Sequence, residues 1–176
     1  DSLTLLYLLQ EFQKLSKYKF ALAAGHIGLG YQDQPGILEA FCRRLGIPFY
    51  YQPTNISQVV FEIRQEKNPC SLCANMRRGA LNNLAKNNGY DKVALGHHLD
   101  DVLETVLLKT FFEGKMDCFK PVSFLTVKEV TVIRPLIYIE EKEISKFAKQ
   151  MAFPVVKSCC PANGLTKRQS MKEMIE

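Results

Sequence analysis

"ALGHHLDDVLET", residues 94–105, carries the transition from a short apolar strand to a helix. The apolar residues before Gly96 predict a buried strand over 91–98, and the leucine- and valine-rich stretch after it predicts a helix over 99–114. In sheets built from alternating strands and helices, ligands bind beyond the carboxyl ends of the strands. We therefore expect this stretch to lie at a ligand-binding edge.

The same alternation extends to both sides of this stretch. Further helices are predicted at 2–17, 34–46, 56–67, 71–88 and 140–151, with a last basic helix at the chain end, and further strands at 20–30, 47–54 and 129–139. Such alternation predicts an α/β fold, a doubly wound and mostly parallel sheet. The sequence shows no repeat or linker, so we expect one domain over residues 1–176.

The composition limits the class of protein. The chain has 176 residues, of which 47% are hydrophobic and 23% are charged, and its net charge is +5. No apolar run approaches the roughly 20 residues of a membrane span, and no export signal is visible, so we expect a cytoplasmic protein without a membrane partner. In that compartment six cysteines favour metal binding or catalysis over disulfides.

Asp100 and Asp101 stand at the start of the predicted helix 99–114. Adjacent carboxylates suit Mg²⁺ bound together with substrate phosphates. The alternative is that they only complement the positive end of the helix dipole. Gly96 just before them would let a ligand approach the backbone closely.

"CSLCANMRRGAL", residues 70–81, places Cys70 and Cys73 on one side of a helix turn. We expect the helix N-terminus and the arginines at 77 and 78 to favour thiolate over thiol. A redox pair lacks the expected strand and turn, and a structural zinc ion would want four ligands. A site of three cysteines, completed by Cys159 or Cys160, fits best. Cys42 and Cys118 are interpreted as core thiols.

Four motifs together resemble a known family. They are "ALGHHLDDVLETVLLKTFF" (94–112), "CSLCANMRRGAL" (70–81), "VIRPL" (132–136) and "FPVVKSCCPANGLTKRQ" (153–169). The first resembles the second nucleotide motif of the PP-loop (N-type) ATP pyrophosphatases, whose fold is of the adenine-nucleotide α-hydrolase type. The second is similar to the tRNA 2-thiolation enzymes of that family, and the others fit its later part.

The resemblance implies a reaction and its partners. ATP, with Mg²⁺ near Asp101, adenylates the C2 carbonyl oxygen of a cytidine or uridine in tRNA and releases pyrophosphate. Sulfur from sulfide or a cysteine desulfurase then displaces AMP. A homodimer is common in the family. Cations that could meet the tRNA backbone are Lys109, Lys115, Lys120, Lys157, Lys167, Arg168 and Lys172, each of which is alternatively an ordinary solvated residue.

The resemblance also assigns site residues. Cys70, Cys73 and Cys160 would hold a [4Fe–4S] cluster with one open iron, and Cys160 is preferred over Cys159 because it precedes a proline. These cysteines and Asp101 are the expected catalytic residues. The expected nucleotide contacts are Asp1, Ser2, Ile27, Arg77, Gly96 and Asp101. Asp1 and Ser2 match the end of the family's SGGKDS loop, so the first strand and SGGK are expected upstream of this chain.

Three rival hypotheses stay open at this point. The same fold could transfer sulfur as a persulfide on Cys73 or Cys160 without a cluster. A tRNA lysidine synthetase would share the "GHHLDD" motif but has no need of the cysteines. A non-catalytic nucleotide- or zinc-binding module would lack the phosphate loop altogether.

Overall fold

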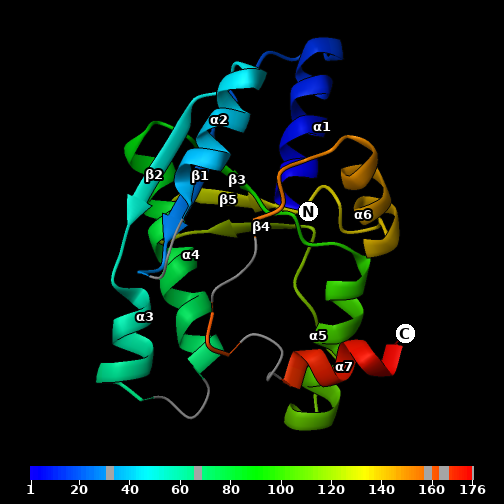
Figure 1. Ribbon diagram of the computed structural model, residues 1–176. Coiled ribbons are helices and arrows are strands. Elements are labelled where there is room, and N and C mark those ends of the chain that lie inside the picture. Colours follow the sequence, from blue (N-terminus) through cyan, green and yellow to red (C-terminus); the bar gives the residue numbers. More distant parts are fainter. Residues whose placement is uncertain (31–33, 66–68, 157–159, 163–166, 176) are drawn as a thin grey trace. The chain divides into compact units, whose positions relative to one another are not determined.

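The computed structural model contains the alternating helices and strands that the sequence predicts (Figure 1). It describes residues 1–30, 34–65, 69–156, 160–162 and 167–175. These residues form two compact units. Unit 1 contains Asp1–Leu6, Lys92–Phe153 and the C-terminal helix; unit 2 contains Tyr7–Asp91 and the segment that carries Cys160.

Unit 2 is built around two parallel strands. Strand β1 (Ala24–Gly28) pairs with β2 (Phe49–Pro53), with Ala24 opposite Phe49. Helices α2 (Pro35–Leu45) and α4 (Pro69–Asn87) pack against this pair, and α1 (Ser2–Leu15) begins in unit 1 and continues into unit 2. The connection between parallel strands thus runs through a helix, as it must in an α/β fold.

The core of unit 2 contains Ile27, Ile56 and Val60, and the last of these has no exposed surface. Partly buried side chains that pack against it include Leu72, Cys73, Met76, Leu81 and Leu84 of α4. The helix predicted over 56–67 differs from expectation. It has one α turn, α3 (Ile56–Gln58), and then a π-helical segment, η1 (Val59–Ile63), in which the N–H of Arg64 donates to the carbonyl of Val59.

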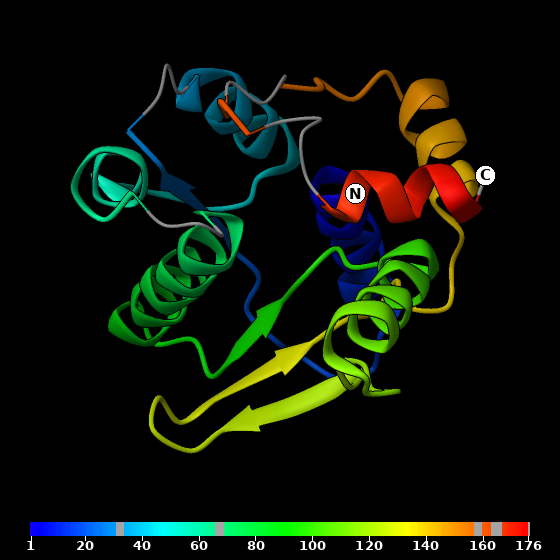
Figure 2. The ribbon, with the colours of Figure 1, turned by 90° about the horizontal axis from the view of Figure 1, so that it is seen from below.

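Unit 1 contains a mixed sheet in the order β3-β5-β4 (Figure 2). Strand β3 (Lys92–Ala94) is parallel to β5 (Val130–Ile133), and β4 (Val122–Leu125) is antiparallel to β5. Three helices complete the unit: α5 (Leu99–Glu113), α6 (Glu141–Gln150) and α7 (Lys167–Ile175). Strand β4, for which the sequence analysis predicted no strand, is the antiparallel edge strand of this sheet.

The α/β class with parallel strands is confirmed, and the strands of the described residues pair in two sets rather than in one continuous ladder. The expectation of one domain over 1–176 stays a prediction. Within the described residues, no helix combines the length and apolar character that crossing a membrane requires.

Candidate functional site

The end of β3 lies against the first residues of α1 in unit 1. A Cβ atom added to Gly96 would stand 3.1 Å from the backbone nitrogen of Ser2 and 3.1 Å from the carbonyl carbon of Asp1. The backbone of α1 fills the space that we expected a ligand to need. Gly96 is thus required by the close packing of two backbone segments, and its contact with nucleotide stays a prediction.

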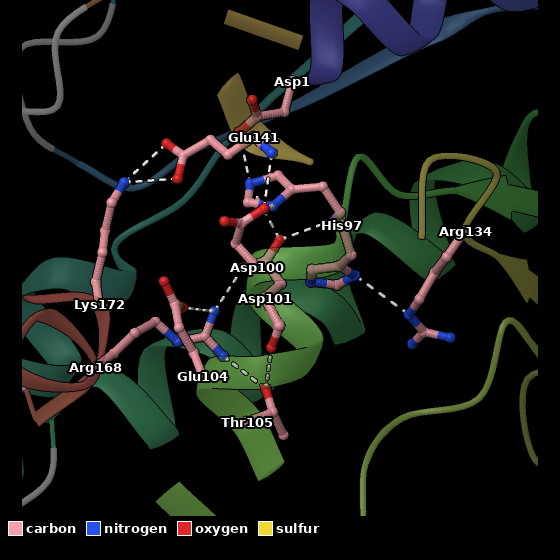
Figure 3. Close-up of polar contacts among 11 residues, drawn as sticks. Asp1, His97, Asp100, Asp101, Glu104, Thr105, Arg134, Glu141, Arg168 and Lys172 are labelled. Atoms are coloured by element: carbon pink, nitrogen blue, oxygen red, sulfur yellow. Dashed lines mark hydrogen bonds and ion pairs between the residues drawn. The ribbon is translucent and has the colours of Figure 1, made fainter. Parts of the chain in front are cut away.

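Asp101 is held at the first turn of α5 by two groups on opposite sides of its carboxylate (Figure 3). Its Oδ2 accepts a hydrogen bond from the backbone N–H of His98 at 3.1 Å, and its Oδ1 accepts one from Nη1 of Arg168 at 2.7 Å. The carboxylate is 17% exposed. It is therefore oriented by protein groups and still reachable from solvent.

The ring of His98 is buried among three carboxylates. Its Nε2 lies 3.5 Å from Asp101 Oδ2 and 3.9 Å from Asp1 Oδ2, and its Nδ1 lies 3.6 Å from Asp100 Oδ2. Asp1 precedes helix α1, where its carbonyl accepts the N–H of Leu5. The predicted nucleotide residues at the start of α1 and α5 are thus brought together around one imidazole.

Asp100 has a different role from its neighbour. Its Oδ2 accepts the backbone N–H of Glu141 at 2.7 Å, at the first residue of α6. This hydrogen bond satisfies one of the N–H groups that a helix start leaves without a partner. The adjacent carboxylates of the motif therefore diverge: Asp100 caps α6, and Asp101 faces Arg168.

Glu104, which the sequence analysis did not single out, is buried beneath Asp101 on α5 with 6% of its side chain exposed. Burial raises the pKa of its carboxyl, Arg168 opposes this shift and the charge of Asp101 reinforces it. Arg168 Nη1 lies 3.4 Å from Glu104 Oε2. An acidic residue three positions after Asp101, on the same face of the predicted helix, was the available signal.

Arg134 in the "VIRPL" motif is a second residue whose role was missed. It is buried, and it donates to the carbonyl of Lys120 at 2.6 Å and to His97 Nδ1 at 3.2 Å. Its guanidinium also stacks 4.9 Å from the ring centre of Phe119. Arg134 thereby ties the strand end of β5 to the residue that follows Gly96.

The cysteine pair lies at the start of α4 in unit 2. Cys70 is exposed and Cys73 is half-buried. Contrary to the expectation of a favoured thiolate, the pKa of Cys73 is raised, first by burial and then by the charges of Cys160 and Cys70, while Arg77 lowers it. The expectation took account of helix and arginine charges but not of the packing of Cys73 against the core.

Cys160 lies in unit 2 with Cys70 and Cys73, and its charge contributes to the raised pKa of Cys73; the three-cysteine site stays a prediction. Cys159 lies outside the described residues. In the described part of the chain, no three metal-binding side chains converge on a point suited to one ion. Thiolates are the usual ligands of iron–sulfur clusters, so the residue type suits a cluster, and the ligand set stays a prediction.

The other residues singled out from the sequence differ in how far they are buried. Ile27 is 3% exposed in the core of unit 2, and its contact with adenine stays a prediction. Arg77 is exposed one turn after Cys73. Cys42 is a fully buried core thiol, as expected, and Cys118 is partly buried, with its Sγ 3.8 Å from the carbonyl of Val102.

Several cations considered for tRNA contact have acidic partners. Lys109 pairs with Asp117 at 2.5 Å, and Lys172 pairs with Glu141 at 2.6 Å. Lys167 lies 3.9 Å from the ring centre of Phe112. Lys157 falls outside the described residues.

The comparisons with known proteins agree with this arrangement. The family model of the PP-loop domain matches residues 1–168, and the chain therefore belongs to the PP-loop family. Within the family it is similar to proteins named tRNA-cytidine(32) 2-sulfurtransferase. That of Citrifermentans bemidjiense is 38% identical over 180 residues, which cover 100% of this chain and 71% of the relative. That of Pelobacter propionicus is 40% identical over 180 residues, which cover 100% of this chain and 67% of the relative.

A solved structure is also similar to the chain. It is the U34-tRNA thiolase NcsA from Methanococcus maripaludis with its [4Fe-4S] cluster, with a TM-score of 0.78 and 27% sequence identity. The match covers 98% of this chain and 60% of the thiolase chain.

Proposed function

We propose that the chain is the ATP-using part of a tRNA 2-sulfurtransferase that replaces the C2 oxygen of a tRNA pyrimidine with sulfur. The observation that carries the proposal is the similarity of the whole chain to proteins named tRNA-cytidine(32) 2-sulfurtransferase, in a PP-loop protein whose helix α4 begins with Cys70 and Cys73. Thiols at this position would serve sulfur transfer and are not needed to bind ATP. The relatives at 38% and 40% identity support cytidine as the base.

The reaction has two steps. The carbonyl oxygen of the base attacks the α-phosphorus of ATP, and pyrophosphate leaves with the electron pair of the broken P–O bond. Sulfide then attacks C2, and AMP leaves with the original oxygen. Carbonyl oxygen is a poor leaving group and AMP is a good one, so ATP supplies the driving force.

The residues of unit 1 would serve the first step. The carboxylate of Asp101 suits Mg²⁺, which proteins bind through one or two carboxylates together with substrate phosphates. The N-terminus of α1 at Asp1 and Ser2 presents backbone N–H groups of the kind that bind phosphate. Mg²⁺, the nucleotide contacts and the role of Asp101 are proposals that rest on the family and on this geometry.

The thiols of unit 2 would serve the second step. Cys70, Cys73 and Cys160 would hold a [4Fe–4S] group, which when bound would supply an open iron site for sulfide. A thiol must lose its proton to bind iron. Because the pKa of Cys73 is raised, we expect iron binding to be favoured at higher pH. Arg77 favours the thiolate and carries a charge that could hold phosphate.

The test is anaerobic purification followed by counting of iron, zinc and acid-labile sulfide, and by mass spectrometry of nucleosides from tRNA incubated with ATP, Mg²⁺ and sulfide. We expect 2-thiocytidine and about four irons and four sulfides per chain. Both should be lost in Cys70→Ala, Cys73→Ala and Cys160→Ala. Cys42→Ala is the matched control because its thiol is fully buried in the core.

The results separate the alternatives. Thiolation that survives without iron, and that requires a cysteine desulfurase in place of sulfide, would replace the cluster with a persulfide on Cys73 or Cys160. One zinc per chain that depends on these cysteines would make the site structural. Absence of any thiolated nucleoside, with ATP and sulfide present, would contradict the proposed function.

A further inference from the structure

Helix α7 packs across α5 within unit 1 (Figures 1 and 2). Near its start, Arg168 reaches the first turns of α5 through both guanidinium nitrogens. Nη1 donates to Asp101 Oδ1 at 2.7 Å, and Nη2 donates to Thr105 Oγ1 at 3.1 Å. Thr105 Oγ1 in turn donates to the carbonyl of Asp101 at 2.7 Å.

The guanidinium of Arg168 contacts two carboxylates that would otherwise repel each other. Asp101 and Glu104 both lie on the face of α5 that Arg168 covers, and the charge of Asp101 adds to the raised pKa of Glu104. Without the guanidinium, Asp101 Oδ1 would lose the donor that α7 supplies, and the carboxylate would lose its fixed orientation.

A second contact anchors α7 without touching Asp101. Lys172, one turn after Arg168, donates to both oxygens of Glu141, at 2.8 Å and 2.6 Å. Glu141 belongs to α6. The helix is thus fastened by two cations of the same face, and Arg168 contacts the proposed nucleotide residue Asp101 (Figure 3).

We propose that Arg168 is a positioning residue of the nucleotide site, which holds the Asp101 carboxylate in the orientation that binds Mg²⁺ with ATP. The inference rests on the proposed function, because it assumes that Asp101 faces the nucleotide. It makes the C-terminal helix a part of the site for ATP. Because Arg168 acts through Asp101, its replacement should weaken binding of the nucleotide together with Mg²⁺ and not binding of the nucleotide alone.

The test measures binding of an ATP analogue with a methylene group between the α- and β-phosphorus, by calorimetry, with and without Mg²⁺. The protein is compared with Arg168→Met, Arg168→Lys, Lys172→Met and Asp101→Asn. We expect Arg168→Met to weaken Mg²⁺-dependent binding about 10- to 100-fold, which is the usual effect of removing a group that orients a metal ligand. Arg168→Lys should recover part of this loss, because lysine supplies the positive charge but not the two planar donor nitrogens of the guanidinium.

Lys172→Met is the matched control. It removes one anchor of α7 and should lower the unfolding temperature about as much as Arg168→Met, yet leave Mg²⁺-dependent binding within about twofold. Equal loss of binding in both variants would overturn the inference, since Arg168 would then only hold the helix. Tighter binding in Arg168→Met would also overturn it, because Arg168 would then compete with Mg²⁺.

Failure of the inference is distinguishable from failure of the proposed function. If Asp101→Asn alone weakens binding, Arg168 has no positioning role and the nucleotide site stands. If Asp101→Asn leaves Mg²⁺-dependent binding unchanged, both the role of Asp101 and that of Arg168 are wrong. Thiolation of tRNA by the unaltered protein decides the function separately.

Discussion

Arg134 Nε donates a hydrogen bond to Nδ1 of His97 over 3.2 Å (Figure 3). A ring nitrogen that accepts carries no proton, so the neutral imidazole of His97 has its proton on Nε2. Arginine stays charged at any ordinary pH, so its side of the contact is always the donor. The contact therefore fixes both the ring orientation and the tautomer of the residue that follows Gly96.

Replacing Arg134 should destabilise unit 1. Arg134→Met removes hydrogen bonds of a buried guanidinium to His97 and to the carbonyl of Lys120. We expect the free energy of unfolding in urea to fall by about 2–3 kcal/mol, since hydrogen bonds to charged groups are worth more than neutral ones. Nitrogen NMR should show the tautomer of His97 becoming mixed. Exposed Arg78→Met should change the free energy by less than about 0.5 kcal/mol.

Gly96→Ala should also destabilise the fold. The added methyl group would stand 3.1 Å from the backbone of Ser2 and of Asp1, which are not flexible side-chain ends. Overpacking of this kind costs about 1–3 kcal/mol, measurable as a lower urea midpoint. Gly79→Ala is the control, because nothing lies within 4 Å of its added Cβ in helix α4. It should raise stability by about 0.5–1 kcal/mol, and equal effects at the two sites would contradict the packing argument.

The alkylation rate of Cys73 in metal-free protein should rise with pH around a midpoint above that of an ordinary thiol. Burial is the main cause of the raised pKa, and the charges of Cys160 and Cys70 add to it. Arg77→Met should move the midpoint higher, because it removes the charge that favours the thiolate. Cys160→Ala should move it lower. Arg78→Met should leave it unchanged, and a shift as large as that of Arg77→Met would contradict the assignment.

Glu104 should make stability depend on pH. Its pKa is higher in the folded protein, so the folded state binds this proton more tightly than the unfolded chain. The protonated carboxyl adds stability below the unfolded pKa, and this contribution is lost as the pH rises through the folded pKa. As the pH rises from about 4 to about 7, the free energy of unfolding should fall less in Glu104→Gln than in the unaltered protein. Parallel curves in urea titrations would contradict this.

Much of the fold follows from the sequence because the spacing of apolar residues that specifies a strand or a helix involves only residues close together in the chain. The start of β3, the length of α5 and the glycine that ends it at Gly114 are all set by neighbouring residues. The π-helical turn of η1 was not predicted, since its residues have the same apolar pattern as an α-helix. The direction of β4 was not predicted either, because pairing with β5 depends on a partner outside the strand.

The site was predictable only in part for the same reason. Motif spacing and the resemblance predicted Cys70, Cys73, Cys160 and Asp101 as site residues, and these assignments stay predictions. The raised pKa of Cys73 depends on packing between segments that no local pattern describes. The contact of Arg168 with Glu104 joins residues far apart in the chain, and neither residue type is unusual on a helix surface.

Asp100 and Asp101 are neighbours in sequence but make different contacts. One holds the first N–H of α6 and the other faces Arg168 of α7. A mutational survey of this protein should therefore find both positions intolerant but for different reasons. Changes at Asp100 would reduce the amount of folded protein in the cell, whereas Asp101→Asn would leave abundance nearly intact and remove activity. With the proposed role of Asp101, natural selection would act on Asp100 as part of the scaffold and on Asp101 as part of the chemistry, although a single codon boundary separates them.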